Sequence, residues 1–253
     1  MTTQTPRPRQ ALNRSIAWYL RQWSRLLNVL DDEELERIIP MLSERSFRPR
    51  QQLFLAGERP ERVYLILKGR VKVYQVAENG KEIILDIASK GGIVGDMGVV
   101  ENGERIACAQ AMDDAVAVTI SWEDFSYFVQ HSPRLGFAMA DLMAKRVVRM
   151  QRTILSLVSK PVSARLAEML LQRAEDDGTI RLGLTHAELA QTIGTSRESV
   201  TALLSRFVVL GALVPSGDGY VPGEDGLLDA IASGELSVSP RHPVASQPAA
   251  AAG

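Results

Sequence analysis

The sequence predicts an α+β protein in which a β-rich segment is followed by a long helix and then by a mostly helical part. Between residues 47 and 120, short apolar or β-branched runs alternate with turn residues, which is typical of a sandwich, barrel or jelly roll. No long helices intervene between these runs, which argues against a parallel sheet. Residues 136–157 carry apolar side chains at heptad spacing and predict one long helix.

Length and charge set wide limits on the function. The chain has 253 residues, with 29 Lys and Arg against 30 Asp and Glu and a formal net charge of −1. This length accommodates one or two domains, and the neutral balance excludes a histone-like protein. The balance is not uniform, because residues 144–173 hold seven Lys and Arg but one Glu. A local basic stretch of this kind is enough for a nucleic-acid-binding face.

Composition also excludes several classes of site. A single cysteine, Cys108, excludes an intramolecular disulfide and a four-cysteine iron–sulfur site. His131, His186 and His242 show no metal-ligand spacing, so no metal is expected. The chain has no nucleophile elbow, phosphate loop or glycine fingerprint, and we expect no enzymatic activity. No apolar run reaches the roughly 18–20 residues of a membrane span, so we expect a cytoplasmic protein with no membrane partner.

Changes of pattern along the chain predict five segments. Residues 1–24 are expected to form a polar arm and a first helix, and residues 25–133 the β-rich domain. Residues 134–160 form the long helix, which yields to a hinge at Pro161. Residues 161–236 form the second domain, and residues 237–253, rich in Ser, Pro and Ala, are expected to be disordered. The clearest strands are expected at 63–67, 71–74, 83–85 and 116–120.

The long helix has a regular apolar seam. Apolar or small residues alternate at spacings of four and three from Gly136 to Leu157, with basic residues alongside. A narrow seam of this kind predicts a helix that pairs with a copy of itself. The alternative is a core helix packed on its own sheet. The residues expected between two copies are Ala140, Met143, Val147, Met150, Ile154 and Leu157.

Residues 184–207 follow the layout of a helix-turn-helix, and residues 214–221 predict a hairpin directly after it. Thr185 and Glu188 form a capping box, Gly194 supplies the turn, and Ser196 caps the second helix. The outer face of the second helix carries side chains that can reach bases in a major groove. These side chains are Arg197, Glu198, Thr201, Ala202 and Ser205. The alternative is a solvated Arg-Glu pair on an ordinary helix.

Two segments resemble a known family of transcription regulators, the cyclic-AMP receptor protein/FNR superfamily. They are Gly194-Thr195-Ser196-Arg197-Glu198-Ser199-Val200 and the sheet pattern Leu65–Val73. The resemblance covers roughly residues 25–223. It implies an N-terminal cyclic-nucleotide-binding-type jelly roll, a long dimerisation helix and a C-terminal winged helix-turn-helix. It also implies a homodimer that binds a pseudo-palindromic site in double-stranded DNA and contacts RNA polymerase.

The resemblance also places an effector pocket. Cyclic-AMP-binding relatives use a Glu for the ribose, an Arg for the phosphate, a neighbouring hydroxyl, and two polar residues on the long helix for adenine. The matching positions here are Gly95, Asp96, Arg105 and Ile106, with Met150 and Gln151 on the helix. Arg105 is retained, whereas Asp96 is one methylene shorter than Glu and Ile106 has no hydroxyl. Met150 cannot hydrogen-bond a base.

These departures from the family pattern leave three alternatives for the ligand of the pocket. Losing a buried hydrogen-bond partner costs about 1–3 kcal/mol, so two losses lower affinity roughly a hundred-fold. We therefore do not expect the tight cyclic-AMP binding of the prototype. A cyclic nucleotide and another small anion on Arg105 are two alternatives. The third is that no ligand is required and that Arg105 pairs with Asp96 or Glu104 instead.

The resemblance also assigns contacts to DNA. Arg197 and Glu198 match base-reading residues, whereas Ala202 replaces a second arginine and offers only a methyl contact. His186 replaces a basic residue at a position that contacts phosphate in relatives. The predicted DNA-contacting residues are Thr185, His186, Ser196, Arg197, Glu198, Thr201, Ala202 and Ser205. The alternative function is a cyclic-nucleotide-type regulatory subunit that acts on another protein.

Overall fold

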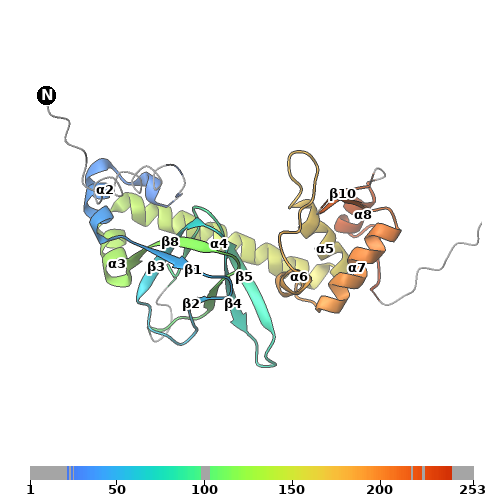
Figure 1. The fold of residues 1–253 in the computed structure, drawn as a ribbon, viewed down its shortest axis with the longest axis horizontal. Coiled ribbons are helices and arrows are strands. Elements are labelled where there is room, and N and C mark those ends of the chain that lie inside the picture. Colours follow the sequence, from blue (N-terminus) through green and yellow to red (C-terminus); the bar gives the residue numbers. More distant parts are fainter. Residues whose placement is uncertain are drawn as a thin grey trace, which may run out of the picture. The chain divides into compact units, whose positions relative to one another are not determined.

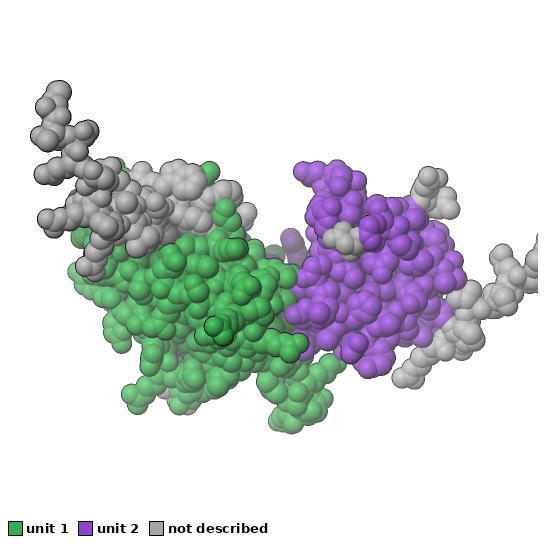
Figure 2. Space-filling view, viewed as in Figure 1, with its two compact units in different colours: residues 1–148 green, residues 149–253 purple. Residues whose placement is uncertain are grey.

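The structure is a computed structural model that describes residues 22, 24, 26–97, 103–217, 219–223 and 226–240. It divides into two compact units, residues 1–148 and residues 149–253 (Figure 2). The border falls inside the long helix α4 (Pro133–Ser159) rather than at either of its ends. The sequence predicts this helix as a separate segment, whereas the structure divides it, with residues 133–148 in unit 1 and residues 149–159 in unit 2.

Unit 1 contains two antiparallel sheets, whose strands are labelled in Figure 1. The first sheet has the order β1-β8-β3-β6, with β1 at Ser43–Phe47, β8 at Ala115–Ser121, β3 at Arg62–Lys68 and β6 at Ile93–Val94. The second has the order β2-β7-β4-β5, with β2 at Gln52–Phe54, β7 at Cys108–Ala111, β4 at Val71–Val76 and β5 at Glu82–Ala88. All neighbouring strands pair antiparallel. The predicted jelly roll is confirmed.

Strand β3 is buried on both faces, which explains its unbroken apolar run. Tyr64 and Ile66 point into the core between the two sheets. Val63 and Leu65 point the other way, into a second core. Helices close this second core, and they are η1 (Leu27–Val29), α2 (Asp32–Ile38), η2 (Ile39–Met41), α3 (Trp122–His131) and the first turns of α4.

Unit 2 is a winged helix-turn-helix, as the sequence predicts. Its helices are α5 (Val162–Leu171), α6 (His186–Ile193), α7 (Arg197–Val209) and α8 (Leu227–Ser233). The wing is the antiparallel hairpin of β9 (Leu213–Ser216) and β10 (Gly219–Pro222). Ile180 extends the wing through two backbone hydrogen bonds with Tyr220, 2.7 and 3.0 Å long. Among the described residues, no helix of either unit has the length and apolar character to cross a membrane.

The break that the sequence predicts at Pro161 is observed. Helix α4 ends at Ser159, and Pro161 is the N-cap residue of α5. Lys160 Nζ donates to Glu168 Oε2 at 3.1 Å and to the carbonyl of Ala232 at 3.2 Å. The residue after α4 is therefore tied to α5 and α8 within unit 2.

The disordered tail predicted for residues 237–253 is wrong at its start. Val238 is 6% exposed, and its N–H donates to Ser163 Oγ of α5 at 3.4 Å. A buried side chain and a backbone hydrogen bond to α5 thus hold the start of a segment whose composition alone indicates disorder. The rest of that prediction, from residue 241 onward, lies outside the described residues, as does nearly all of the arm and first helix predicted at 1–24.

Candidate nucleic-acid interface and ligand pocket

A capping box fixes the start of α6. The backbone N–H of Glu188 donates to Thr185 Oγ1 at 3.2 Å, and Glu188 Oε2 accepts from the Thr185 N–H at 2.7 Å. The Thr185 hydroxyl also donates to the same carboxylate at 2.9 Å. The predicted cap is confirmed, and it makes His186 the first residue of the helix.

The turn between the two helices depends on Gly194. This residue has φ +68° and ends α6 in the left-handed conformation that glycine adopts without a penalty. A Cβ at this position would lie 3.0 Å from Leu157 Cδ2 of α4. Ser196 then caps α7, because its Oγ accepts from the Ser199 N–H at 3.2 Å. Both predicted end signals are confirmed.

Helix α7 has a buried and an open face. Its inward side chains are Val200, Leu203, Leu204 and Phe207, all of which are buried. On the other side, a shallow depression of about 430 Å³ is lined by Arg197, Glu198, Thr201, Ala202 and Ser205. These are the five side chains that the sequence places on the outer face. The pKa of Glu198 lies below its ordinary value, first because of a hydrogen bond from its own backbone N–H and then because of Ser196.

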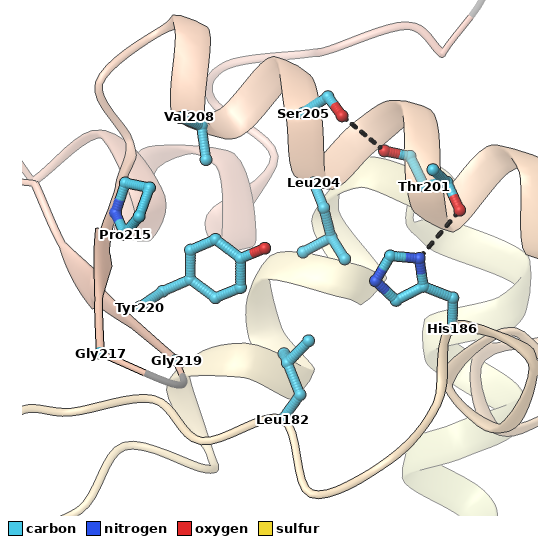
Figure 3. A pocket seen from close by; sticks show the side chains of 10 residues that line it. All are labelled: Leu182, His186, Thr201, Leu204, Ser205, Val208, Pro215, Gly217, Gly219 and Tyr220. Atoms are coloured by element: carbon cyan, nitrogen blue, oxygen red, sulfur yellow. Dashed lines mark hydrogen bonds between the residues drawn. The ribbon is translucent and has the colours of Figure 1, made fainter.

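A second hollow, of about 540 Å³, lies where the start of α6, α7 and the wing meet (Figure 3). His186 Nδ1 is 2.9 Å from Thr201 Oγ1 in this hollow. The hydroxyl of Thr201 donates to the carbonyl of Arg197 at 3.0 Å, and the hydroxyl of Ser205 donates to the carbonyl of Thr201 at 3.1 Å. Both hydroxyls are therefore bonded back to α7 itself. The link between His186 and Thr201 could not be predicted from sequence, because the two residues lie 15 positions apart on different helices.

Arg105 sits in the jelly roll with its terminal nitrogens already bonded. Its side chain is buried, with Nη1 donating to the carbonyl of Gly95 at 2.8 Å and Nη2 to that of Arg62 at 2.6 Å. Its Cζ lies 4.1 Å from the centre of the Phe54 ring. Burial lowers the pKa of this guanidinium. Its Nε has no hydrogen-bond partner among the described residues.

The ion pair that the sequence allowed for Arg105 is formed by another arginine. Asp96 accepts from Arg146 Nη1 of α4 at 2.7 Å, and Arg146 Nη2 donates to the carbonyl of Ile93 at 3.1 Å. The expectation that Arg105 pairs with Asp96 or Glu104 is wrong, because the guanidinium of Arg105 turns toward backbone carbonyls. Burial raises the pKa of Asp96 above its ordinary value, and Arg146 opposes this shift.

The remaining predicted pocket residues are Gly95, Ile106, Met150 and Gln151. Ile106 is half exposed and supplies no donor from its side chain. Met150 and Gln151 are exposed on the part of α4 that belongs to unit 2. Gly95 lies against Arg105, since a Cβ at residue 95 would be 2.9 Å from Arg105 Nη1. The structure thus groups Gly95, Asp96 and Arg105 and adds Phe54 and Arg146.

The seam of α4 changes character along its length. Leu135 is fully buried, and Ala138, Met139 and Leu142 pack on the second core of unit 1. Farther along, Val147, Met150, Ile154 and Leu157 are 43% to 60% exposed. The first turns thus behave as a core helix. The later turns present apolar side chains that the chain itself leaves uncovered.

Two family models match the chain. The model described as "Cyclic nucleotide-binding domain" covers residues 44–132, and the model described as "Crp-like helix-turn-helix domain" covers residues 164–227. The first range corresponds to the jelly roll of unit 1. The second corresponds to the winged helix of unit 2.

Individual proteins agree with these models. A CRP-like cAMP-activated global transcriptional regulator of Mycobacterium tuberculosis is 29% identical over 166 residues, which are 63% of this chain and 74% of the relative. The cAMP-activated global transcriptional regulator CRP of Pasteurella multocida is 30% identical over 181 residues, 68% of this chain and 86% of the relative. A structure of a CooA mutant from Carboxydothermus hydrogenoformans is 27% identical with a TM-score of 0.67, covering 83% of this chain and 95% of that one. With both domains matched and a relative of this identity and coverage, the chain belongs to the cyclic-AMP receptor protein/FNR family of DNA-binding transcription regulators.

Proposed function

We propose that this protein binds a pseudo-palindromic site in double-stranded DNA as a homodimer and regulates promoters in the cytoplasm, in contact with RNA polymerase. The observation that carries the proposal is the outer face of α7. The inner face of α7 is packed into the core of the domain. On the outer face, the exposed side chains around one depression are Arg197, Glu198, Thr201 and Ser205. This is the arrangement of a helix that enters a major groove.

The residue types on this face favour a G·C-containing half-site. Arg197 can donate two parallel hydrogen bonds to guanine, and the ionised carboxylate of Glu198 can accept from cytosine N4. Ala202 is half-buried and offers a methyl group, which suits thymine. We therefore expect base discrimination to depend mainly on the first turn of α7.

Phosphate contacts surround this base-reading turn. Thr185 and Ser196 cap α6 and α7, so their neighbouring N–H groups and helix dipoles favour a phosphate. His186 and Ser205 stand at the edge of the hollow between α7 and the wing. The basic residues within 144–173 that are not held in ion pairs add a sequence-independent attraction. Binding should therefore weaken steeply as salt is added.

A second copy of the chain is the proposed cover for the seam of α4. The proposed contacts are Ala140, Met143, Val147, Met150, Ile154 and Leu157. Burying exposed apolar side chains against the same side chains of a partner gives a two-fold interface. A two-fold dimer that binds a palindrome needs its two recognition helices about one DNA turn apart, roughly 34 Å.

The pocket of unit 1 favours regulation without an obligatory cyclic-AMP ligand. The relatives named above are described as cAMP-activated, and in cyclic-AMP-binding relatives an arginine and a glutamate hold phosphate and ribose. Here Arg105 already donates to two carbonyls and Asp96 is already paired with Arg146. A cyclic nucleotide or another small anion would have to compete with these contacts.

Selection of bound DNA from a random pool, with and without cyclic AMP, tests the whole proposal. We expect a two-fold symmetric site with a G·C pair in each half, recovered equally under both conditions. Recovery that requires cyclic AMP would overturn the ligand part of the proposal. If no sequence is enriched at modest salt, the regulatory-subunit alternative replaces DNA binding.

A further inference from the structure

We propose that His186 is a proton-linked contact to the DNA backbone, so that each subunit takes up one proton on Nε2 when it binds DNA. The inference rests on the proposed use of α6 and α7 as the DNA-binding face. His186 is the first residue of α6, is half-buried and stands at the edge of the 540 Å³ hollow next to the wing. Histidine is the side chain that commonly changes charge between pH 5 and 8.

The hydrogen bonds around Thr201 determine which nitrogen of His186 carries a proton. The Thr201 hydroxyl has one hydrogen, and it is donated to the carbonyl of Arg197 at 3.0 Å. The 2.9 Å contact between His186 Nδ1 and Thr201 Oγ1 must then be donated by the imidazole. Nδ1 therefore bears the proton in the neutral ring, and Nε2 holds the lone pair.

This tautomer allows His186 to gain a positive charge without rearrangement. A second proton adds to Nε2, which Figure 3 shows on the side of the ring that faces the hollow. The bond from Nδ1 to Thr201 is kept, because Nδ1 is a donor in both states. The opposite tautomer would break this bond on protonation, since Nδ1 would have to change from acceptor to donor.

The titratable and charged groups around His186 favour a phosphate as the partner of its positive charge. Tyr220 of β10 is the other titratable side chain among the described residues that line the hollow. On α6, the nearby carboxylate of Glu188 is bound to both the N–H and the hydroxyl of Thr185. On α7, Arg197 and Glu198 bring one charge of each sign near Thr201. Asp218, between β9 and β10 in the sequence, lies outside the described residues.

A bound phosphate explains why proton uptake accompanies binding. A phosphate that reaches the hollow favours the imidazolium form of His186, because the two pair in a charge-assisted hydrogen bond. Lower pH therefore strengthens binding, and the added cation displaces one more counterion per subunit.

The test measures DNA affinity of the full-length dimer by fluorescence anisotropy at pH 6.0 and pH 8.0, over a series of salt concentrations, on a site recovered by selection. For wild type we expect affinity to rise about five-fold or more toward pH 6.0. The slope of log affinity against log salt should steepen by roughly two, one for each subunit. His186→Gln should lose both the rise in affinity and the steeper salt slope toward pH 6.0, and His186→Lys should show little pH dependence with a steep slope throughout.

His131→Gln is the matched control. His131 lies on α3 in unit 1, where its Nδ1 is 2.8 Å from the carbonyl of Tyr127, and this variant should keep the full pH dependence. Long-range ¹H–¹⁵N spectra of the free protein add a direct readout, in which His186 should appear as the Nδ1–H tautomer. An Nε2–H tautomer, or equal pH dependence in His186→Gln and wild type, contradicts the inference. Loss of DNA binding by wild type at every pH would instead contradict the proposed function.

Discussion

The Nη1 atom of Arg146 lies 2.7 Å from Oδ2 of Asp96, which joins helix α4 to the segment after β6 inside unit 1. The carboxylate is almost completely covered, with 2% of its side chain exposed, and the guanidinium is 16% exposed. A buried carboxylate without a partner is costly, and this pair with Arg146 offsets part of that cost. The same contact occupies the acid that the family resemblance assigns to a ligand.

Arg146→Gln should destabilise unit 1 by roughly 3 kcal/mol at pH 8, because it leaves a buried carboxylate without its counter-charge. The pKa of Asp96 is already above its ordinary value through burial, and the substitution raises it further. A carboxyl whose folded pKa is raised stabilises the fold below its unfolded pKa, and this contribution is lost as pH rises through the folded pKa. Urea unfolding between pH 4 and 8 should show a deficit that grows with pH.

Lys145→Gln is the matched control for this experiment. Lys145 precedes Arg146 on the same helix and pairs with Asp141 at 2.6 Å, but both side chains are more than half exposed. An exposed pair of this type contributes about 0.3–0.5 kcal/mol. Equal losses in the two variants, or a deficit in Arg146→Gln that shrinks with rising pH, would show that Asp96 does not depend on Arg146.

Arg197→Ala should weaken binding to the selected DNA site by about 1–3 kcal/mol per half-site and relax the preference for one base pair. The reason is the loss of a bidentate contact to guanine from the first residue of α7. Anisotropy titrations on the selected site and on a site with that base pair exchanged measure both effects. Arg37→Ala, an equal change of charge on α2, should bind like wild type. If Arg197→Ala still discriminated the two sites as wild type does, another residue would read that base pair.

The end signals of α6 and α7 could be predicted from sequence because they are local. Thr185, Glu188, Gly194 and Ser196 act on backbone groups within four residues, so their spacing is enough to identify them. Short strands were harder, since β1 reads Ser-Glu-Arg-Ser-Phe with little apolar character and β6 has two residues. Helix α8 lacks a side-chain cap and was not predicted either.

Contacts between distant segments could not be predicted. Arg146 and Asp96 are 50 residues apart, and Arg146 reads from sequence only as a basic residue beside the seam. The direction in which the Arg146 side chain points depends on how the first turns of α4 pack on the second core. No local sequence pattern encodes this packing. The same holds for Arg105, whose carbonyl partner at Arg62 is 43 residues away. Gly95, Asp96 and Arg105 could therefore be predicted as pocket residues, whereas their pairing and the contributions of Phe54 and Arg146 could not.

Ile154→Arg should convert the dimer to a monomer at micromolar concentration. Ile154 is 57% exposed on the seam, and burying an isoleucine contributes about 1.5–3 kcal/mol in each copy. The substitution also sets two like charges against each other across the two-fold axis, so the dimer Kd should rise at least about a hundred-fold. Sedimentation equilibrium measures this change. Thr153→Arg, one residue away on an exposed side of α4, should remain dimeric. If the Ile154→Arg variant remained dimeric, the dimer interface would have to lie outside the seam.

Gly194→Ala tests whether the last turn of α4 supports the turn of the helix-turn-helix. Two costs add at this position, since φ is +68° and the new Cβ would lie 3.0 Å from Leu157 Cδ2. A left-handed conformation costs alanine about 1–2 kcal/mol, and crowding Leu157 adds roughly 1 kcal/mol. Gly178→Ala isolates the first cost, because Gly178 has φ +79° and a Cβ there would meet nothing within 4 Å.

Repeating both glycine substitutions in a Leu157→Ala background completes a double-mutant cycle. We expect the free energy lost by Gly194→Ala to fall by about 1 kcal/mol in that background, because the crowded methyl group is gone. The loss caused by Gly178→Ala should stay the same in both backgrounds. Thermal or urea unfolding of unit 2 provides the measurement. An unchanged cost for Gly194→Ala would mean that the turn is held by its own backbone conformation and that α4 contacts the rest of unit 2 elsewhere, as through Ser156 Oγ and Glu168 Oε2 at 3.4 Å.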